Sequence, residues 1–209
     1  MRWGLNMEKD IAQMVKYTRL AYERGYVGGT GGNTSVRIGD AMYITQTGAV
    51  LGEVCSDQLV KVPLGVQYSK PGEAKGAPSK EYLFHQKIFE IRQDINVVLH
   101  LHPVDCIAAI LLLKEGEPLP VYVPGHLKKL GRPPQLSYFP AGSRELAEGI
   151  ADQFAQNDCV WLRRHGIVTG GKDAQSAFSK AEDMIDSSRL HLALRGHGAL
   201  TPQQIEVLL

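Results

Sequence analysis

Cysteine is scarce in this sequence, and its three copies are widely separated. Cys55, Cys106 and Cys159 form no Cys-x-x-Cys pair. Closely spaced cysteines are typical of disulfide frameworks and of thiolate zinc sites, so the sequence argues against both. We therefore expect each cysteine to be a small buried apolar side chain.

The sequence also lacks long apolar runs and any excess of charge. No apolar segment approaches the roughly 20 residues that a membrane-spanning helix needs, and the polar N-terminus has no signal-like apolar core. Charged residues make up 22% of the chain and its formal net charge is +1, which does not indicate a surface for nucleic acid or anionic lipid. These absences favour a cytoplasmic protein with no nucleic-acid and no membrane partner.

What the chain does contain is an alternation of helix and strand patterns. Its 209 residues and 44% hydrophobic content suit one domain that spans residues 1–209. A helical apolar pattern ends before Gly25, and a glycine-rich stretch at 28–33 then leads into a β-hairpin pattern at 36–45. Because interleaved elements form layers and an early hairpin disfavours an all-parallel sheet, we predict an α/β fold with a mixed, mainly antiparallel sheet between helices.

The remaining predicted elements continue this alternation. Ser79 is a plausible N-cap of a helix that reaches Ile91. The other segments are predicted strands at 59–62, 96–102, 136–139 and 159–162, helices at 104–113, 143–156 and 173–194, a surface loop at 69–78 and a proline-rich connection at 118–134.

The sharpest local signal is a pair of histidines two positions apart in a strand pattern. Side chains on a strand alternate between its faces, so His100 and His102 project from the same face and could chelate one ion. Imidazole suits zinc, and catalytic zinc commonly has three protein ligands with one open position. Taken alone, the pair is equally well explained as two hydrogen-bonded histidines of a sheet.

Other residues could complete or adjoin such a site. His165 follows the 159–162 strand, where a turn could point its imidazole into a cleft, although taken alone such a residue is more often a turn histidine than a ligand. Glu81 is the natural carboxylate partner, although early helix glutamates usually just interact with the helix dipole. His85 lies one helical turn after Glu81, which permits joint metal binding but favours an intrahelical or packing role. We interpret His191 and His197 as surface residues.

Three short segments could bind an anion, because backbone N–H groups in glycine-rich loops and at helix N-termini point at anions. Each segment alone reads as a turn or as a cap beside a solvated charge, so only their convergence in space would make a site. They are Gly31-Gly32-Asn33, Thr47-Gly48 and Ser79-Lys80.

In their order and separation, five motifs between about residues 10 and 195 resemble the class II aldolase/adducin family. The motifs are Gly29-Thr30-Gly31-Gly32-Asn33-Thr34-Ser35, Ile44-Thr45-Gln46-Thr47-Gly48, Pro78-Ser79-Lys80-Glu81, His100-Leu101-His102 and Arg164-His165-Gly166. Gln46 replaces a proline that is common in the family. The resemblance implies a three-layer α/β/α sandwich with a mainly antiparallel mixed central sheet, assembled as a homotetramer with its sites at subunit interfaces.

The resemblance also implies roles for individual residues. It implies one Zn²⁺ per subunit bound by His100, His102 and His165, with Glu81 approaching the metal and serving as the catalytic acid/base. It implies that the substrate phosphate is bound by Asn33, Thr47, Gly48, Ser79 and Lys80.

One position departs from the family pattern. Several members have a tyrosine proton donor near residues 123–126, and the best-aligned position here is Gly125. His126 is the candidate catalytic donor in its place, with Tyr122 as the alternative. If it is not the donor, we interpret His126 as a loop residue.

The implied function is that of a zinc-dependent carbon–carbon lyase acting on a small phosphorylated sugar. Aldol cleavage of a ketose 1-phosphate and decarboxylation of a 3-oxo-tetronate 4-phosphate both need a carbonyl that accepts electrons from the breaking bond, which gives an enediolate, and a zinc Lewis acid meets that need. Ser79-Lys80-Glu81 and the run at 129–142 look most like the decarboxylase branch.

Two alternatives stay open. An epimerase or dehydratase could use the same enediolate. A non-catalytic adducin-like interaction module is disfavoured, because this chain keeps all three histidines together with Glu81.

Overall fold

The computed structural model describes residues 2–68 and 76–208, so most of the predicted loop at 69–78 lies outside the described residues. Helices and strands interleave along the chain, as the sequence predicts. In chain order they are α1 (Arg2–Glu23), β1 (Asn33–Ile38), β2 (Ala41–Thr45), the 3₁₀ helix η1 (Ser56–Gln58), β3 (Leu59–Pro63), α2 (Tyr82–Ile91), β4 (Val97–Leu101), α3 (Val104–Leu111), α4 (Pro124–Leu130), β5 (Gln135–Leu136), α5 (Arg144–Phe154), β6 (Cys159–Leu162), β7 (Gly166–Gly171), α6 (Ala174–Leu194) and α7 (Pro202–Glu206).

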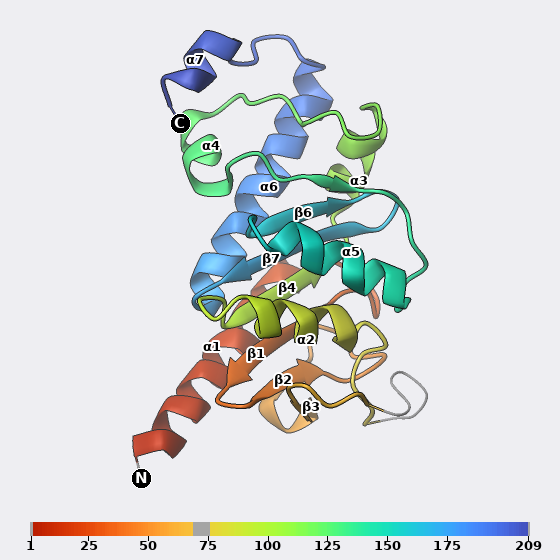
Figure 1. The fold of residues 1–209 in the computed structure, drawn as a ribbon, viewed down its shortest axis with the longest axis vertical. Coiled ribbons are helices and arrows are strands. Elements are labelled where there is room, and N and C mark those ends of the chain that lie inside the picture. Colours follow the sequence, from red (N-terminus) through yellow and green to blue (C-terminus); the bar gives the residue numbers. More distant parts are fainter. Residues whose placement is uncertain (1, 69–75, 209) are drawn as a thin grey trace.

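The strands form one seven-stranded sheet in the order β3-β2-β1-β4-β7-β6-β5. Five of the neighbouring pairs are antiparallel, and only β5 and β6 are parallel. Helices α2 and α5 cover the face seen in front in Figure 1, while α1, α3 and α6 lie behind it. The fold is therefore the predicted α/β/α sandwich around a mixed, mainly antiparallel sheet.

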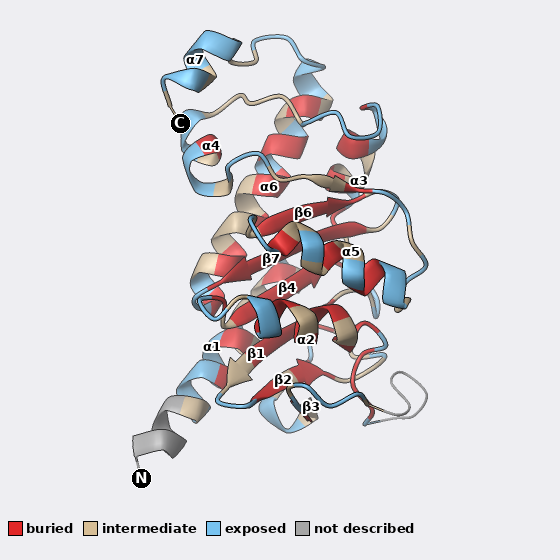
Figure 2. Cartoon of the chain, viewed as in Figure 1, coloured by how far each residue is buried: buried red, intermediate tan, exposed pale blue. Residues whose placement is uncertain are grey.

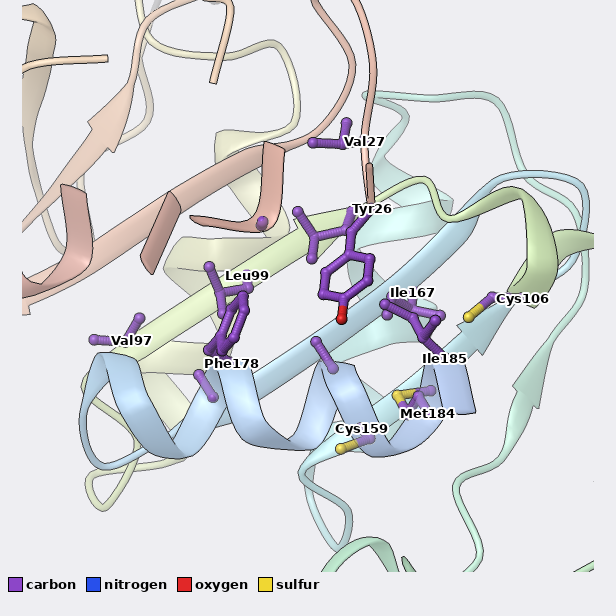
Figure 3. Packing of buried hydrophobic residues seen from close by; sticks show 14 of the residues in the cluster. Tyr26, Val27, Val97, Leu99, Cys106, Cys159, Ile167, Phe178, Met184 and Ile185 are labelled. Atoms are coloured by element: carbon purple, nitrogen blue, oxygen red, sulfur yellow. The ribbon is translucent and has the colours of Figure 1, made fainter. Parts of the chain in front are cut away.

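Buried apolar side chains lie on both sides of this sheet, and in Figure 2 most of the sheet and parts of the helices that cover it are coloured as buried. The rear core lies between the sheet and α1, α3 and α6, and the front core lies between the sheet and α2 and α5. Figure 3 shows part of the rear core, in which Phe178 and Ile185 of α6 face Leu99 and Ile167 of the sheet. Because both faces are covered, the central strands have no exposed side.

Strand β4 is buried along its whole length. Leu99 belongs to the rear core, whereas its neighbour Val98 belongs to the front core. The alternation of a strand then puts His100 on the front face, where its ring lies edge-on to Phe84 of α2 at 5.5 Å between centroids. The strand thus directs His100 toward the start of α2.

Several sequence expectations need correction. Ser79 does not cap α2, because the helix begins at Tyr82 with Glu81 at its N-cap position. His191 is not a surface residue: it is buried and its Nδ1 lies 3.0 Å from the Tyr122 hydroxyl. Cys55 is only partly buried, unlike the other two cysteines. Strand β7 and helices α4 and α7 were not expected at all.

The termini of the described helices agree better with the sequence. Asp173 caps α6 by accepting a hydrogen bond from the Ser176 N–H at 2.7 Å, and Ser143 caps α5 in the same way from Leu146 at 3.1 Å. Throughout the described ranges, each helix is too short or too polar to cross a membrane.

Candidate metal centre

Four titratable side chains from three separate segments converge beside the end of β4. His100 lies in this strand and His102 directly follows it, Glu81 precedes α2, and His165 lies in the turn between β6 and β7. One ligand atom from each residue lies within 4.8 Å of the others. The structure thus brings together the four residues that the sequence analysis predicts as a metal site.

The turn between β6 and β7 brings His165 to the site. Its backbone N–H donates to the Leu162 carbonyl at 3.1 Å, and Arg164 adopts a left-handed conformation with φ of 60°. Gly166 allows the next strand to lie close to β4, since a Cβ there would be 2.2 Å from the Leu101 carbonyl oxygen. A side chain at this position would push the His165 turn away from β4.

The glycine-rich loop before β1 packs against His100 of β4 and against His102, which directly follows that strand. A Cβ on Gly31 would lie 2.9 Å from His102 Nδ1, and one on Gly32 would lie 2.6 Å from the His100 carbonyl oxygen. Gly32 also has a φ of +70°, which disfavours side chains. These glycines therefore permit close packing of the loop on the histidine strand.

The three imidazoles present the same nitrogen to one another. His100 Nε2 lies 2.8 Å from His102 Nε2 and 3.3 Å from His165 Nε2. Tetrahedral zinc with Zn–N bonds of about 2.0–2.1 Å separates its nitrogen ligands by about 3.3 Å. The spacing of these nitrogens is therefore close to that of a zinc-bound histidine cluster.

The hydrogen bonding of His100 shows which nitrogen is available for a metal. Its Nδ1 lies 2.9 Å from the Ile167 carbonyl oxygen, and a carbonyl can only accept, so Nδ1 carries the proton. Nε2 then holds a lone pair that faces the other two rings. Lone pairs pointed at one another repel unless a cation lies between them, so the donor set fits a metal ion.

Glu81 completes the cluster with a carboxylate that is only 4% exposed. Its Oε2 lies 3.3 Å from His100 Nε2 and its Oε1 lies 3.4 Å from His165 Nε2. The Asn33 amide donates to Oε2 at 2.9 Å, whereas Oε1 is buried without a hydrogen-bond partner among the described residues. A carboxylate oxygen that is buried and unpaired is a further sign that a cation fits here.

The pKa of Glu81 is held well below its ordinary range. Burial opposes ionisation, but the neighbouring imidazoles of His100 and His165 and the hydrogen bond from Asn33 outweigh it. Burial and the nearby imidazoles lower the pKa of His102 to about 3 and that of His165 to about 4. At neutral pH the site thus combines an ionised carboxylate with neutral imidazoles at His102 and His165, which are the protonation states that bind a metal.

The segments predicted to bind phosphate lie next to this cluster. Residues 45–47 and 77–79 run side by side, with the Thr47 N–H donating to the Ala77 carbonyl at 2.9 Å and the Ser79 N–H donating to Thr45 at 3.2 Å. The Ser79 hydroxyl accepts from the Glu81 N–H at 3.3 Å. The structure thus brings Thr47 next to the segment that leads through Ser79 to Glu81, and Gly48 and Lys80 follow Thr47 and Ser79 directly in the chain.

The two candidate proton donors lie on other elements. His126 of α4 contacts α6, where its Nδ1 is 2.9 Å from the Ser187 hydroxyl and its Nε2 is 3.9 Å from Asp183. The Tyr122 hydroxyl contacts His191 and the backbone near Gly196. Within the described residues, no hydrogen bond joins either group to the four clustered residues.

Sequence reasoning missed one part of the site. His85 is completely buried, and its two ring nitrogens lie near Asn33 Oδ1 and the Ser35 hydroxyl of β1. The spacing between Glu81 and His85 was noticed, but the contact with β1 depends on how α2 packs on the sheet. No local signal in the sequence reveals that packing.

Comparisons with known proteins agree with this geometry. Residues 12–192 match the model of the Class II Aldolase and Adducin N-terminal domain. An L-fuculose phosphate aldolase of Methanococcus maripaludis is 35% identical over 87% of this chain and 96% of its own length. A 3-oxo-tetronate 4-phosphate decarboxylase of Haemophilus influenzae is 30% identical over 90% of both chains. The structure of YgbL from Klebsiella pneumoniae superposes with a TM-score of 0.85 at 25% identity, covering 97% of this chain and 98% of that one.

The chain belongs to the class II aldolase and adducin family. Its relatives are aldolases and decarboxylases, and it carries a possible metal site of the kind that such enzymes use. It is a metal-dependent lyase of the class II aldolase or decarboxylase type.

Proposed function

We propose that this protein is a zinc-dependent carbon–carbon lyase that cleaves a ketose 1-phosphate by a retro-aldol reaction. One observation carries the proposal: the Nε2 atoms of three histidines and a buried, ionised carboxylate meet at one point. The name and 35% identity of the Methanococcus maripaludis relative support the substrate class.

The histidines and the carboxylate of the site have different proposed roles. His100, His102 and His165 would hold one zinc ion, which would supply a Lewis acid that polarises the substrate carbonyl. Glu81 would move the proton, with Oε1 as the acting atom because it has no hydrogen-bond partner among the described residues. A well-placed acid/base of this kind typically contributes about 10²–10⁴-fold in rate.

The phosphate would bind at one side of this cluster and orient the substrate. Lys80 is exposed and contributes to the lowered pKa values of His102 and His165, so its positive charge acts on the site. Asn33, Thr47, Gly48, Ser79 and Lys80 are the proposed phosphate-binding residues. Holding the phosphate fixes the carbonyl at the metal position.

Decarboxylation of a 3-oxo-tetronate 4-phosphate is the second candidate. The decarboxylase of Haemophilus influenzae is 30% identical to this chain, and Ser79-Lys80-Glu81 resembles that branch. Both reactions place electrons from a breaking carbon–carbon bond on a polarised carbonyl, so the same residues serve either one. The products distinguish the two reactions. Aldol cleavage gives an aldehyde and a ketose fragment, whereas decarboxylation releases carbon dioxide.

The first experiment combines metal analysis with a substrate screen. We expect about one zinc per chain after purification, and release of aldehyde from ketose 1-phosphates or of carbon dioxide from 3-oxo-tetronate 4-phosphates. The screen includes assays for epimerised and dehydrated products, which would assign the site to those reactions instead. Protein with neither metal nor turnover would point to the adducin-like interaction module.

Two histidine variants test the assignment of the metal ligands. His102→Ala removes one of the three nitrogens and should abolish both zinc binding and turnover. His197→Ala is the matched control, because His197 is exposed in the C-terminal segment and should leave both unchanged. Full turnover in metal-free His102→Ala protein would contradict the mechanism.

The homotetramer and the cytoplasmic location implied by the resemblance stay predictions. Sedimentation equilibrium of the purified protein tests the first, and fractionation of cells tests the second. The role of His126 as proton donor also stays a prediction, and His126→Ala kinetics with each substrate class address it.

A further inference from the structure

A chain of buried hydrogen bonds runs from Glu81 away from the metal position. The Asn33 Nδ2 donates to Glu81 Oε2 at 2.9 Å, and Asn33 Oδ1 lies 2.5 Å from His85 Nε2. On the other side of the imidazole, Nδ1 lies 2.7 Å from the Ser35 hydroxyl. All four residues are buried, at 4% exposure or less.

The donor and the acceptor of each of these three hydrogen bonds can be assigned. An ionised carboxylate only accepts, so the NH₂ group of Asn33 must face Glu81 and its oxygen must face His85. That oxygen needs a donor, so His85 carries its proton on Nε2. The opposite nitrogen, Nδ1, then accepts from the Ser35 hydroxyl, because burial lowers the pKa of His85 to about 3 and keeps the ring neutral.

We propose that His85 is a positioning residue for Glu81, and that it acts by holding the Asn33 amide in the one orientation that donates to the catalytic carboxylate. The kinetic part of this inference rests on the proposed lyase function, whereas its structural part does not. With Oε2 held by Asn33, Oε1 of Glu81 lies 3.4 Å from His165 Nε2 and has no hydrogen-bond partner among the described residues. A flipped amide would instead turn its oxygen toward the carboxylate and repel it.

The contacts of His85 with strand β1 support a positioning role over simple packing. Asn33 and Ser35 are two positions apart on β1, so their side chains lie on the same face. The imidazole bridges them with both nitrogens, and Asn33 is paired with His100 across β1 and β4. An apolar side chain stacked on Phe84 would fill the space without either hydrogen bond.

The first test needs neither metal nor substrate. Nitrogen-15 NMR of histidine-labelled protein distinguishes the two neutral tautomers, and loss of one signal set in His85→Gln identifies His85. We expect the Nε2–H tautomer at pH 7. An Nδ1–H tautomer or a charged ring would contradict the donors and acceptors assigned to the hydrogen bonds between Glu81 and Ser35.

The second test compares two substitutions of the same residue. His85→Gln retains an amide N–H that can reach Asn33 Oδ1, whereas His85→Leu keeps the bulk and removes the donor. Loss of a residue that supports a metal-site side chain typically costs about 10–100-fold, so we expect kcat to fall by about that factor in His85→Leu with one zinc retained and KM within about threefold of wild type. His85→Gln should recover most of kcat.

A neighbouring residue provides the matched control. Gln86 is also buried on α2, but its amide donates to the Pro63 and Val66 carbonyls, away from the cluster. Gln86→Leu should lower stability and leave kcat unchanged, which separates general damage to α2 from loss of positioning. Equal losses of kcat in Gln86→Leu and His85→Leu would contradict the proposal.

The outcomes separate this inference from the proposed function. Wild-type protein that binds zinc with the Nε2–H tautomer but turns over no sugar phosphate contradicts the lyase proposal and leaves the arrangement of His85 intact. Active wild-type protein with undiminished kcat in His85→Leu contradicts positioning and leaves the lyase proposal intact. If His85→Leu does not fold, the tautomer and the kcat of His85→Gln decide the question.

Discussion

Three histidines in and behind the candidate site have lowered pKa values. Burial is the first cause for His102, His165 and His85 alike, and neighbouring imidazoles add to it. Of these, His85 is the one most suited to measurement, because it contacts no proposed metal ligand directly and a single substitution removes its titration.

We predict that His85 makes the folded apoprotein sensitive to mild acid. Burial lowers its pKa from 6.5 to about 3. Above pH 6.5 the ring is neutral in both the folded and the unfolded chain and contributes nothing to the pH dependence. Below pH 6.5, the unfolded chain takes up a proton that the folded chain does not accept. The free energy of unfolding therefore falls by about 1.4 kcal/mol for each pH unit.

The measurement compares urea denaturation of metal-free wild type and His85→Gln at pH 7 and pH 5. Wild type should lose about 2 kcal/mol more than the variant over this interval. The other histidines are common to both proteins and cancel in the difference. Parallel pH profiles would show that His85 is not held neutral by burial.

At the scale of single residues, strand periodicity made part of the site predictable. His100 and His102 could be placed on one face because alternation is a local property. The hydrogen bond between Asn33 and Glu81 could not be predicted in this way, because it depends on the register that pairs Asn33 with His100 and on the packing of α2 against the sheet. Asn33 was predicted as a phosphate ligand, and its contact with Glu81 adds a role that sequence alone did not suggest.

At the scale of elements, the glycine-rich loop before β1 has a measurable role. We predict that Gly31→Ala weakens zinc binding, because the new Cβ would lie 2.9 Å from His102 Nδ1. The imidazole can rotate away, so the fold should survive while the ligand geometry does not. A loss of about 10–100-fold in zinc affinity is the expected size for a residue that supports a metal ligand.

Gly28→Ala is the matched control for this loop. It lies three positions earlier in the same loop, its φ is not positive, and a Cβ there would meet nothing within 4 Å. Competition with a chromogenic chelator measures both affinities. Equal zinc affinities in Gly28→Ala and Gly31→Ala would show that the loop does not support His102.

Two of the elements that the sequence did not reveal have separate physical explanations. Strand β7 contains three glycines, which usually indicate turns, yet Gly170 and Gly171 occur where Ile95, Phe154 and the start of α6 leave no room for a side chain. Helix α4 lies in a proline-rich connection and begins at Pro124, where the fixed backbone angle of proline suits a first helical turn. In β7, tertiary packing thus gives the glycines a role different from their usual one, whereas Pro124 has a local role at the start of a helix.

At the scale of the whole molecule, the site joins segments that are distant in the sequence. Glu81 precedes α2, His100 lies in the central strand β4 and His102 directly follows it, and His165 lies between β6 and β7. The alternation of helices and strands was enough to predict the layers. The strand order was not predictable, because it depends on which strands pair across long intervals of the chain.

This arrangement predicts that the bound metal stabilises the whole fold. A metal that binds the folded chain alone adds about 2.7 kcal/mol when its free concentration is 100 times its Kd. For a chain of this size each kcal/mol raises Tm by about 2–4 °C, so zinc-loaded protein should melt about 5–11 °C above chelator-treated protein. Without the metal, the facing lone pairs of the imidazoles and the unpaired Glu81 oxygen have no counterion.

Differential scanning calorimetry with and without chelator measures this shift, and His102→Ala supplies the control. Because the variant lacks one ligand, chelation should leave its Tm nearly unchanged, and its Tm should resemble that of metal-free wild type. A wild-type Tm that does not respond to chelation would mean that the cluster does not couple metal binding to folding. A shift of equal size in His102→Ala would place the stabilising metal elsewhere in the molecule.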